Sequence, residues 1–451
     1  MFPVKYNRMK NNYLARNAWI AGLGGFLFGF DTAVISGAEK AIQELFQLTG
    51  FWHGFTVAVA LIGTIIGAIA ASKPADHFGR KKVLSFIAIL FLFSSLGAAL
   101  SNQWISIVIF RFLGGLGVGA SSVIGPMYIA EISPAEKRGR LVALFQLNVV
   151  TGILLAFLSN YIIAIVSDQT SWRWMLGVQS FPAAIFFLLL FLIPETPRWL
   201  MMKKNKALAV ETLGKLGEKN IDAQIAAIEE SITSEKHIRS EKLFSAKLKL
   251  PLLLAFLIAF FNQFSGINAI MYYAPRIFEM AGLDRTSSLF RSVSVGFTNL
   301  VFTLIAMMII DKIGRKKLLL TGSVGMVFML LLVSLGFLVK SFGGAAVLAG
   351  LIGFIAFFAA SQGAVIWVFI SEIFPNKVRA KGQSFGSLTH WLFAALISWV
   401  FPVIASGNPL NTGFAFIFFA LMMLLQFFVV YFLFPETKGK ALEQIQNELG
   451  L

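Results

Sequence analysis

Two ionisable side chains lie deep inside long apolar stretches of the sequence. Asp31 interrupts the apolar run at 18–38, and Arg111 interrupts the run at 104–130. A charged side chain at the centre of a bilayer costs about 2.5–3.5 kcal/mol on insertion scales, so such residues usually face a cavity and have a partner. The two residues are therefore candidates for an ion pair that tethers two helices, or for a site at which a carboxylate binds a proton.

Neutral amide side chains form a second group that could do chemistry. Gln263 and Asn268 flank Gly266 inside the apolar run at 251–278. A break of the helix at the glycine would let both amides face a cavity, where they could pair with ligand hydroxyl groups. The alternative is that the amides only hold neighbouring helices together by hydrogen bonds.

Residues typical of enzymes and cofactor sites are missing from the sequence. It has no cysteine, and its four histidines, at 53, 77, 237 and 390, do not have metal-ligand spacing. No Gly-x4-Gly-Lys-Ser/Thr loop is present, which excludes ATP hydrolysis. The glycines at 115, 117 and 119 lie inside an apolar run, where small residues indicate close helix packing. We therefore expect no enzyme activity, no metal and no cofactor.

The elements that must position these residues are membrane-spanning helices. Apolar residues make up 57% of the 451 residues and charged residues only 13%, whereas a soluble domain has about 25% charged residues. A bilayer needs about 20 apolar residues per helix. Runs of this kind lie at 18–38, 51–72, 83–101, 104–130, 141–165, 174–194, 251–278, 289–311, 317–339, 345–373, 381–405 and 411–434. The sequence predicts an all-α membrane protein with twelve spans.

The positive charges predict how the chain is oriented. The formal net charge is +16, and 31 of the 38 Lys and Arg fall on the side that holds the N-terminus and every second loop. The positive-inside rule then places both termini and the polar segment 195–250 in the cytoplasm. Because the basic residues form short clusters between apolar runs, they indicate membrane topology and not nucleic-acid binding. The segment 195–250 has apolar residues at helical spacing, which predicts two or three amphipathic helices on the membrane surface.

The sequence also repeats itself. Asp-His-Phe-Gly-Arg-Lys-Lys at 76–82 returns at 311–317 as Asp-Lys-Ile-Gly-Arg-Lys-Lys, and Glu-Ile-Ser-Pro at 131–134 returns at 372–375 as Glu-Ile-Phe-Pro. Pro-Glu-Thr at 194–196 returns at 435–437, so the three offsets are 235, 241 and 241 residues. Three matches at nearly one offset predict two six-helix halves, 1–197 and 251–434, joined by a linker at 198–250 and followed by a short tail at 435–451. A substrate site between such halves is typical of rocker transporters.

These repeated segments, with several others, resemble the sugar porter family of the major facilitator superfamily. The family contains bacterial proton-coupled sugar symporters and animal glucose facilitators. The similarity runs over essentially the whole chain and includes GGFLFGFDTAVISGA at 24–38, PMYIAEISPAEKRGRL within 111–141, PETPRWL at 194–200, NQFSGINAIMYYAP at 262–275 and SEIFP at 371–375. The resemblance implies the major facilitator fold, alternating access and a monosaccharide substrate.

The resemblance also implies roles for individual residues. In proton-coupled relatives an Asp of the first helix carries the proton and an Arg of the fourth tunes it, and Asp31 and Arg111 match both positions. Passive animal facilitators commonly have Asn at the first position. Sugar-binding positions of the family match Gln146, Gln263, Asn268, Asn299 and Trp367, and cavity walls or gates match Phe26, Tyr272, Tyr273, His390 and Trp391.

Charged residues at the cytoplasmic helix ends are expected to form a latch. Opposite charges at neighbouring helix ends can hold the inner side shut and separate as it opens, whereas positive-inside anchoring alone would not explain the paired carboxylates. The first half contributes Asp76, Arg80, Glu131, Arg138, Glu195 and Arg198, and the second contributes Asp311, Arg315, Glu372, Arg379 and Glu436.

Some positions depart from the pattern of the family and leave the sugar open. The usual Gln-Gln pair is Asn262-Gln263 here, and His390 stands where a close relative places Gln. We expect a monomer in the cell membrane that imports a hexose or pentose together with a proton. A passive sugar facilitator and a sugar sensor without significant transport remain the alternatives.

Overall fold

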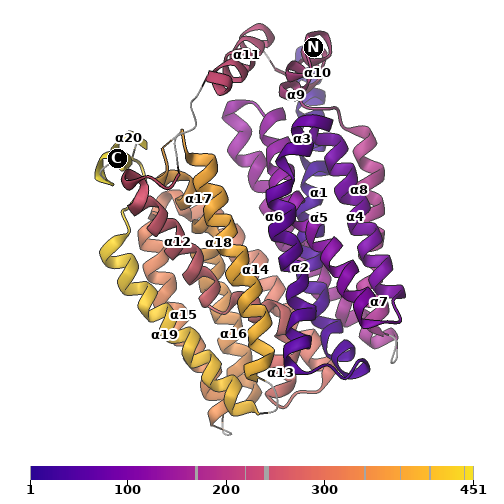
Figure 1. Cartoon of the computed structure of the whole chain (residues 1–451), viewed down its shortest axis with the longest axis vertical. Coiled ribbons are helices and arrows are strands. Elements are labelled where there is room, and N and C mark those ends of the chain that lie inside the picture. Colours follow the sequence, from indigo (N-terminus) through magenta and orange to yellow (C-terminus); the bar gives the residue numbers. More distant parts are fainter. Residues whose placement is uncertain are drawn as a thin grey trace. The chain divides into compact units, whose positions relative to one another are not determined.

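The computed structural model describes residues 2–167, 171–218, 220–237, 243–339, 342–375, 377–405, 408–440 and 442–449. Among these residues, twelve helical segments are long and apolar enough to cross a membrane (Figure 1). They run over 12–45, 50–70, 80–100, 104–132, 137–166, 171–192, 249–280, 285–313, 315–338, 343–373, 379–405 and 409–433. The twelve spans predicted from the apolar runs are confirmed, and each predicted run overlaps one of them.

The described chain through the sixth span forms eight α-helices and one 3-10 turn. There are more helices than spans because one short helix lies between two spans and the sixth span is interrupted. The elements are α1 (Phe2–Leu45), α2 (Gly50–Ala70), α3 (Ser72–Phe78), α4 (Arg80–Leu100), α5 (Trp104–Ile132), α6 (Ala135–Val166), α7 (Ser171–Gly177), α8 (Ser180–Leu189) and η1 (Leu190–Leu192).

The polar segment after the sixth span folds into three short helices in its described part, as predicted. They are α9 (Pro197–Met202), α10 (Lys206–Leu216) and α11 (Ile221–His237), and the 3-10 turn η2 (Ala246–Leu248) follows. The Asn205 side chain caps α10 by accepting a hydrogen bond from the Leu208 N–H. Leu200, Ala209, Leu213 and Ile225 form a small apolar core between these helices.

The described chain from the seventh span onward forms nine α-helices. There are more helices than spans because the seventh and tenth spans are interrupted and one helix follows the last span. The elements are α12 (Lys249–Phe264), α13 (Ile267–Met280), α14 (Arg285–Ile313), α15 (Arg315–Leu338), α16 (Gly343–Ala360), α17 (Gln362–Ile373), α18 (Arg379–Ala405), α19 (Pro409–Leu433) and α20 (Leu442–Glu448).

Contacts between residues divide the chain into two compact units. The first unit contains 1–31, 63–153 and 176–239, and the second contains 32–62, 154–175 and 240–451. Helices α1, α2, α6 and α7 therefore contribute to both units. The division predicted from the repeat, at 197, 250 and 434, concerns sequence symmetry and stays a prediction.

Within the first unit, α4 packs against α5 and α8. Helix α1 approaches α6 so closely that a Cβ atom added to Gly29 would lie 1.9 Å from the Val149 carbonyl oxygen. Small residues allow this distance between backbones, as is common in membrane helices. The close approach fixes the rotation of α1 and therefore the direction in which Asp31 points.

Within the second unit, α15 packs against α16 and α19, and α12 packs against α18. Helix α20 contacts α17 at one end of this unit, and α13 lies toward the other end (Figure 1). The break between α12 and α13 is at Gly266, which has a φ of +86°. Only glycine adopts this conformation without strain, so the glycine explains why the span is interrupted there.

Candidate functional site

Asp31 and Arg111 are in direct contact inside the first unit. Oδ1 of Asp31 accepts a hydrogen bond from Nη1 of Arg111 at 2.9 Å, and the two side chains are only 4% and 2% exposed. The residues are 80 positions apart in the sequence. An ion pair that is removed from solvent is expensive to form and still more expensive to break by losing one partner. This arrangement makes the protonation state of Asp31 decisive for the contact between α1 and α5.

Gln179 belongs to the same cluster and was missed by the sequence reasoning. Its side chain hydrogen-bonds to Asp31, and its Nε2 lies 3.5 Å from the Leu27 carbonyl oxygen. The residue is buried in the two-residue interruption between α7 and α8. Gly177 before it and Pro182 after it are the signal that could have indicated a helix break.

The buried guanidinium of Arg111 retains unused donors. Within the described part of the chain, neither Nε nor Nη2 has a hydrogen-bond partner. Gly114, one turn further along α5, leaves room for this cluster, since an added Cβ would lie 2.4 Å from Ser94 Oγ and 3.4 Å from Asp31 Oδ1. The Asp31 carboxylate is thus tightly packed, whereas Nε and Nη2 of Arg111 are available to form new hydrogen bonds if the Asp31–Arg111 contact changes.

A cluster of amides in the second unit surrounds the break of the seventh span. Gln263 is 1% exposed, and its Oε1 accepts a hydrogen bond from Nδ2 of Asn268 at 2.7 Å. Its Nε2 donates to Oδ1 of Asn262 at 2.9 Å and lies 3.2 Å from the ring nitrogens of His390. The break at Gly266 is what brings Gln263 and Asn268 together across the two helix ends.

Aromatic rings stand beside this amide cluster. The ring centroid of Trp367 on α17 lies 5.0 Å from that of His390, which lies 4.8 Å from that of Trp391. Trp367 is 38% exposed, whereas Trp391 is buried. An exposed aromatic face next to amides is the combination that binds the C–H surface and the hydroxyl groups of a sugar.

The other predicted sugar-site residues are distributed over both units. Asn299 on α14 is half-buried in the second unit. Gln146 on α6 is exposed and Phe26 on α1 is half-buried in the first unit. Tyr272 and Tyr273 are buried in α13, where the backbone of Tyr273 departs from helical geometry. Their roles in binding or gating stay predictions.

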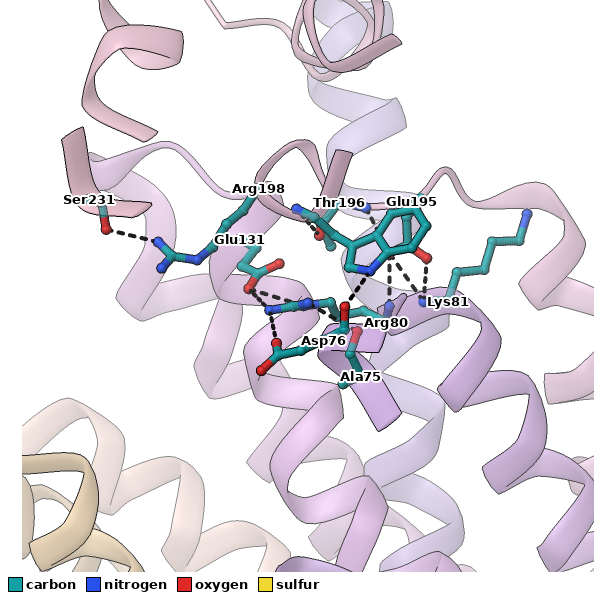
Figure 2. A network of polar contacts seen from close by, with 10 residues as sticks. Ala75, Asp76, Arg80, Lys81, Glu131, Glu195, Thr196, Arg198 and Ser231 are labelled. Carbon is teal, nitrogen blue, oxygen red and sulfur yellow. Dashed lines mark hydrogen bonds and ion pairs between the residues drawn. The ribbon is translucent and has the colours of Figure 1, made fainter. Parts of the chain in front are cut away.

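The geometry of the first charged motif is shown in Figure 2. Arg80 is almost fully buried, and its Nη2 lies 3.1 Å from Oδ1 of Asp76 and 3.0 Å from Oε1 of Glu131. Glu195 accepts hydrogen bonds from the backbone N–H groups of Arg80 and Lys81 at 3.0 and 3.1 Å. The motif therefore ties the ends of α3, α4 and α5 to the segment that follows η1.

The second half repeats this geometry inside the second unit. Arg315 contacts Oδ1 of Asp311 at 2.9 Å and Oε1 of Glu372 at 2.8 Å. Glu436 accepts from the backbone N–H of Arg315 at 2.9 Å and from that of Lys316 at 3.1 Å. The repeated sequences thus produce two equivalent charge networks, each closed within its own unit.

Glycine is required at one position of each network. Gly79 and Gly314 have φ values of 100° and 102°. A Cβ atom added at Gly79 would lie 2.2 Å from Glu195 Oε2, and one at Gly314 would lie 2.5 Å from Glu436 Oε2. The glycine lets the carboxylate reach the free N–H groups at the start of the next helix, where a negative charge is favoured.

Burial changes the titration of the carboxylate that caps α4. Loss of hydration raises the pKa of the Glu195 carboxyl above its ordinary value, although the backbone N–H groups of Thr196, Lys81 and Arg80 act in the opposite direction. Arg198 donates to Ser231 of α11 at 3.0 Å, so it joins the linker helices to the motif. Arg138 is exposed at the start of α6, and Arg379 at the start of α18 has two buried nitrogens that lack partners within the described residues.

The described residues contain no group of three or more His, Cys, Asp or Glu that could hold a metal ion. The amide, aromatic and charged side chains of the two clusters can form hydrogen bonds, stack against a ligand and bind a proton. These interactions suit recognition and transport of a small polar molecule.

Comparison with known proteins agrees with this chemistry. Residues 18–449 match the family model described as "Sugar (and other) transporter". The chain is 37% identical to the arabinose-proton symporter of Bacillus subtilis (95% of this chain, 93% of that protein) and 34% identical to the D-xylose-proton symporter of Escherichia coli K12 (98% and 96%). The inward open structure of the xylose transporter XylE from E. coli aligns with a TM-score of 0.86 at 33% identity, covering 97% of this chain and 100% of XylE.

The twelve candidate spans in the described part of the chain and these similarities define the class of protein, which is a multi-pass membrane transporter with the major facilitator fold. The chain belongs to the sugar porter family of the major facilitator superfamily.

Proposed function

We propose that this protein imports a monosaccharide, a hexose or a pentose, together with a proton by alternating access. The observation that carries the proposal is the buried contact between Asp31 and Arg111, at 2.9 Å. A titratable carboxylate in the middle of a span is a functional site by default. The relatives named as arabinose-proton and D-xylose-proton symporters support the same reading.

Sugar binding is assigned to the amide cluster in the second unit and to the aromatic ring beside it. Gln263 and Asn268 hydrogen-bond to each other, so the two amides are held side by side at the break of the seventh span. Trp367 supplies an exposed ring face. Gln146 and Asn299 are proposed as further ligands, on the basis of their match to the sugar-binding positions of the family.

The proposed location is the cell membrane, with both termini in the cytoplasm and the chain acting as a monomer. The excess of Lys and Arg on the side of the termini supports this orientation, by the positive-inside rule. It places the two charge networks around Arg80 and Arg315 at the cytoplasmic end and the loop between α1 and α2 at the external end. The two six-helix halves are proposed as the parts that move.

Uptake into proteoliposomes tests the proposal. A panel of labelled hexoses and pentoses, with and without an imposed inward proton gradient, should identify one or a few sugars whose accumulation requires the gradient. Uptake that reaches only equilibrium and ignores both pH and a protonophore would instead indicate a passive facilitator. Saturable sugar binding without any uptake would indicate a sensor.

Removal of either motif arginine should slow transport while leaving sugar affinity nearly unchanged. Arg80→Ala and Arg315→Ala each remove contacts to two carboxylates that are not part of the amide cluster. Because the networks stabilise one conformer, their loss changes conformer populations and not ligand contacts. We expect exchange of labelled sugar across vesicles to slow by about tenfold or more, as an energy difference of about 1.4 kcal/mol produces.

Lys203→Ala, on an exposed residue of the linker, is the control for loss of one cytoplasmic positive charge. Sugar affinity is measured calorimetrically on the same preparations. A collapse of affinity with an unchanged exchange rate in either arginine variant would contradict the latch.

A further inference from the structure

A group of charged side chains lies in the second unit where α1 ends and α2 begins. Glu39 of α1 is almost completely buried, with 1% of its side chain exposed. Its Oε2 lies 2.5 Å from Nε2 of His53 on α2 and 3.1 Å from Nη1 of Arg276 on α13. The proposed transport scheme, which places the proton on Asp31, makes no use of this second buried carboxylate.

His53 is the member of this group that can be neutral or cationic, because each ring nitrogen of an imidazole can hold a proton. Its side chain is also 1% exposed. While Nε2 faces Glu39, Nδ1 has no hydrogen-bond partner among the residues that the structure describes. The Tyr273 ring of α13 meets the imidazole edge-on at 5.8 Å, and its hydroxyl donates instead to the Ser398 carbonyl of α18 at 2.9 Å. Nδ1 is therefore the atom that can receive an additional proton.

Glu39 and Arg276 line a cavity of about 100 Å³, which has room for several water molecules. The cavity separates α1 from α13 and the start of α14. Its charged lining consists of Glu39, Lys40, Glu44, Arg276, Glu279 and Arg285.

The charged side chains that line the cavity sum to zero net charge in the arrangement in which α13 contacts α1. The lining contains three carboxylates and three cations, and Lys40 pairs with Glu279 across the cavity. Gln43, which is neutral, accepts a hydrogen bond from Arg276 at 2.6 Å. With His53 neutral the group has no net charge, so a proton on His53 would create an uncompensated buried positive charge, which is costly.

The balance is different if α13 and α14 withdraw from α1. The three residues left on α1 are Glu39, Lys40 and Glu44, with a net charge of −1. Arg276 leaves with α13, so Glu39 keeps only His53 as a partner. A proton on Nδ1 would then make His53 a cation beside a carboxylate and restore neutrality. Opening this contact therefore favours proton binding, and closing it favours release.

We propose that Glu39 and His53 form a second proton-binding site at the external end of the protein. Arg276 and the proton compete for this site. The contact of Glu39 with Arg276 and His53 is called the external gate below. External acid opens the gate, and the return of Arg276 expels the proton as the gate closes. This inference rests on the proposed function, because alternating access supplies the movement of α13, which begins at the break at Gly266.

The gate can be followed with a single-cysteine reporter, because the chain has no cysteine of its own. Ser36 lines the cavity and is 3% exposed, so Ser36→Cys should react with a membrane-impermeant thiol reagent only when the gate opens. The reaction is measured on right-side-out vesicles between pH about 5.5 and 8, a window around the ordinary histidine value. Thr286→Cys, exposed in the first turn of α14, corrects for the pH dependence of the reagent itself.

The corrected rate should rise about tenfold from the alkaline to the acid limit, as a one-unit difference in proton affinity between the gate states produces. His53→Gln should abolish the pH dependence. Glu39→Gln should react quickly at every pH, because Arg276 loses its carboxylate. Gln43→Ala, which removes only a neutral partner of Arg276, should raise the rate and keep the pH dependence.

A corrected rate that does not change with pH would overturn the proposal. A pH dependence of the same size in His53→Gln would do so as well. Exchange of labelled sugar is measured on the same vesicles to separate the two ideas. If the corrected labelling rate of Ser36→Cys does not change with pH in vesicles that still exchange sugar, the second proton site is excluded and the proposed function is unaffected. If vesicles that contain the unmodified chain do not transport any sugar, the proposed function itself is contradicted.

Discussion

Asp31→Asn is expected to abolish proton-driven sugar accumulation while retaining sugar binding and part of the sugar exchange. A proton can drive sugar uphill only if its binding alters a state that binds the sugar. Protonation neutralises Asp31 and releases Arg111 from the contact at 2.9 Å, so α1 and α5 can readjust. Asn keeps the size and hydrogen-bonding capacity of the protonated acid but does not titrate.

The expected effect is large. At about 150 mV, one charge that crosses the membrane supplies about 3.5 kcal/mol, which sustains a sugar gradient of a few hundredfold. Vesicles with Asp31→Asn should show an accumulation ratio near one, measured with labelled sugar under an inward proton gradient.

Glu211→Gln, at an exposed carboxylate of α10, is the matched control and should accumulate sugar like the unmodified chain. Counterflow exchange in both variants shows whether the protein is folded and binds sugar. Full uphill accumulation by Asp31→Asn would defeat the assignment of the proton site.

Gln263→Ala and Asn268→Ala are expected to remove sugar binding while the protein stays folded. The two amides hydrogen-bond to each other at 2.7 Å, and Gln263 also contacts Asn262 and His390. Truncating one amide leaves polar groups of the sugar and of the remaining partners unpaired, at about 1–3 kcal/mol for each lost partner. The affinity for sugar should fall by about 5–150-fold in each variant. If the unmodified chain binds its sugar weakly, binding by the variants is then too weak to detect.

The measurement is calorimetric titration of the purified variants with the transported sugar. Asn411→Ala, at an exposed amide in the first turn of α19, is the matched control and should bind normally. Thermal unfolding of each variant shows whether the fold is intact. Unchanged affinity in both Gln263→Ala and Asn268→Ala would exclude the amides from the sugar site.

The membrane-spanning fold could be predicted because it depends on local composition. A bilayer accepts only segments whose backbone groups are satisfied internally, so a run of about 20 apolar residues specifies a helix whatever surrounds it. The twelve spans follow from this rule. The three short helices of the linker follow from a different local signal, the helical spacing of apolar residues in a polar segment. The interruption at Gly266 was likewise indicated by a local signal, a glycine between two polar residues within an apolar run.

The partners of the charged residues depended on tertiary structure. Asp31 and Arg111 were suspected as a pair because buried charges need partners, but Gln179 was not connected with them. Glu195 was recognised as a motif residue, yet its role as the cap of α4 depends on the left-handed geometry of Gly79. Sequence spacing does not reveal which helix ends meet when they are more than 100 residues apart.

Composition, apolar run lengths and internal repeats therefore specify the class of this protein, with its spans, its repeated halves and the residue types available for proton and sugar. The packing of the helices specifies which of these residues are in contact. Glu39, His53 and Arg276 had no distinguishing pattern in the sequence, and Arg276 is 237 positions from Glu39. They meet because the packing of α1, α2 and α13 fixes the rotation of each helix, and apolar run lengths contain no information about that rotation.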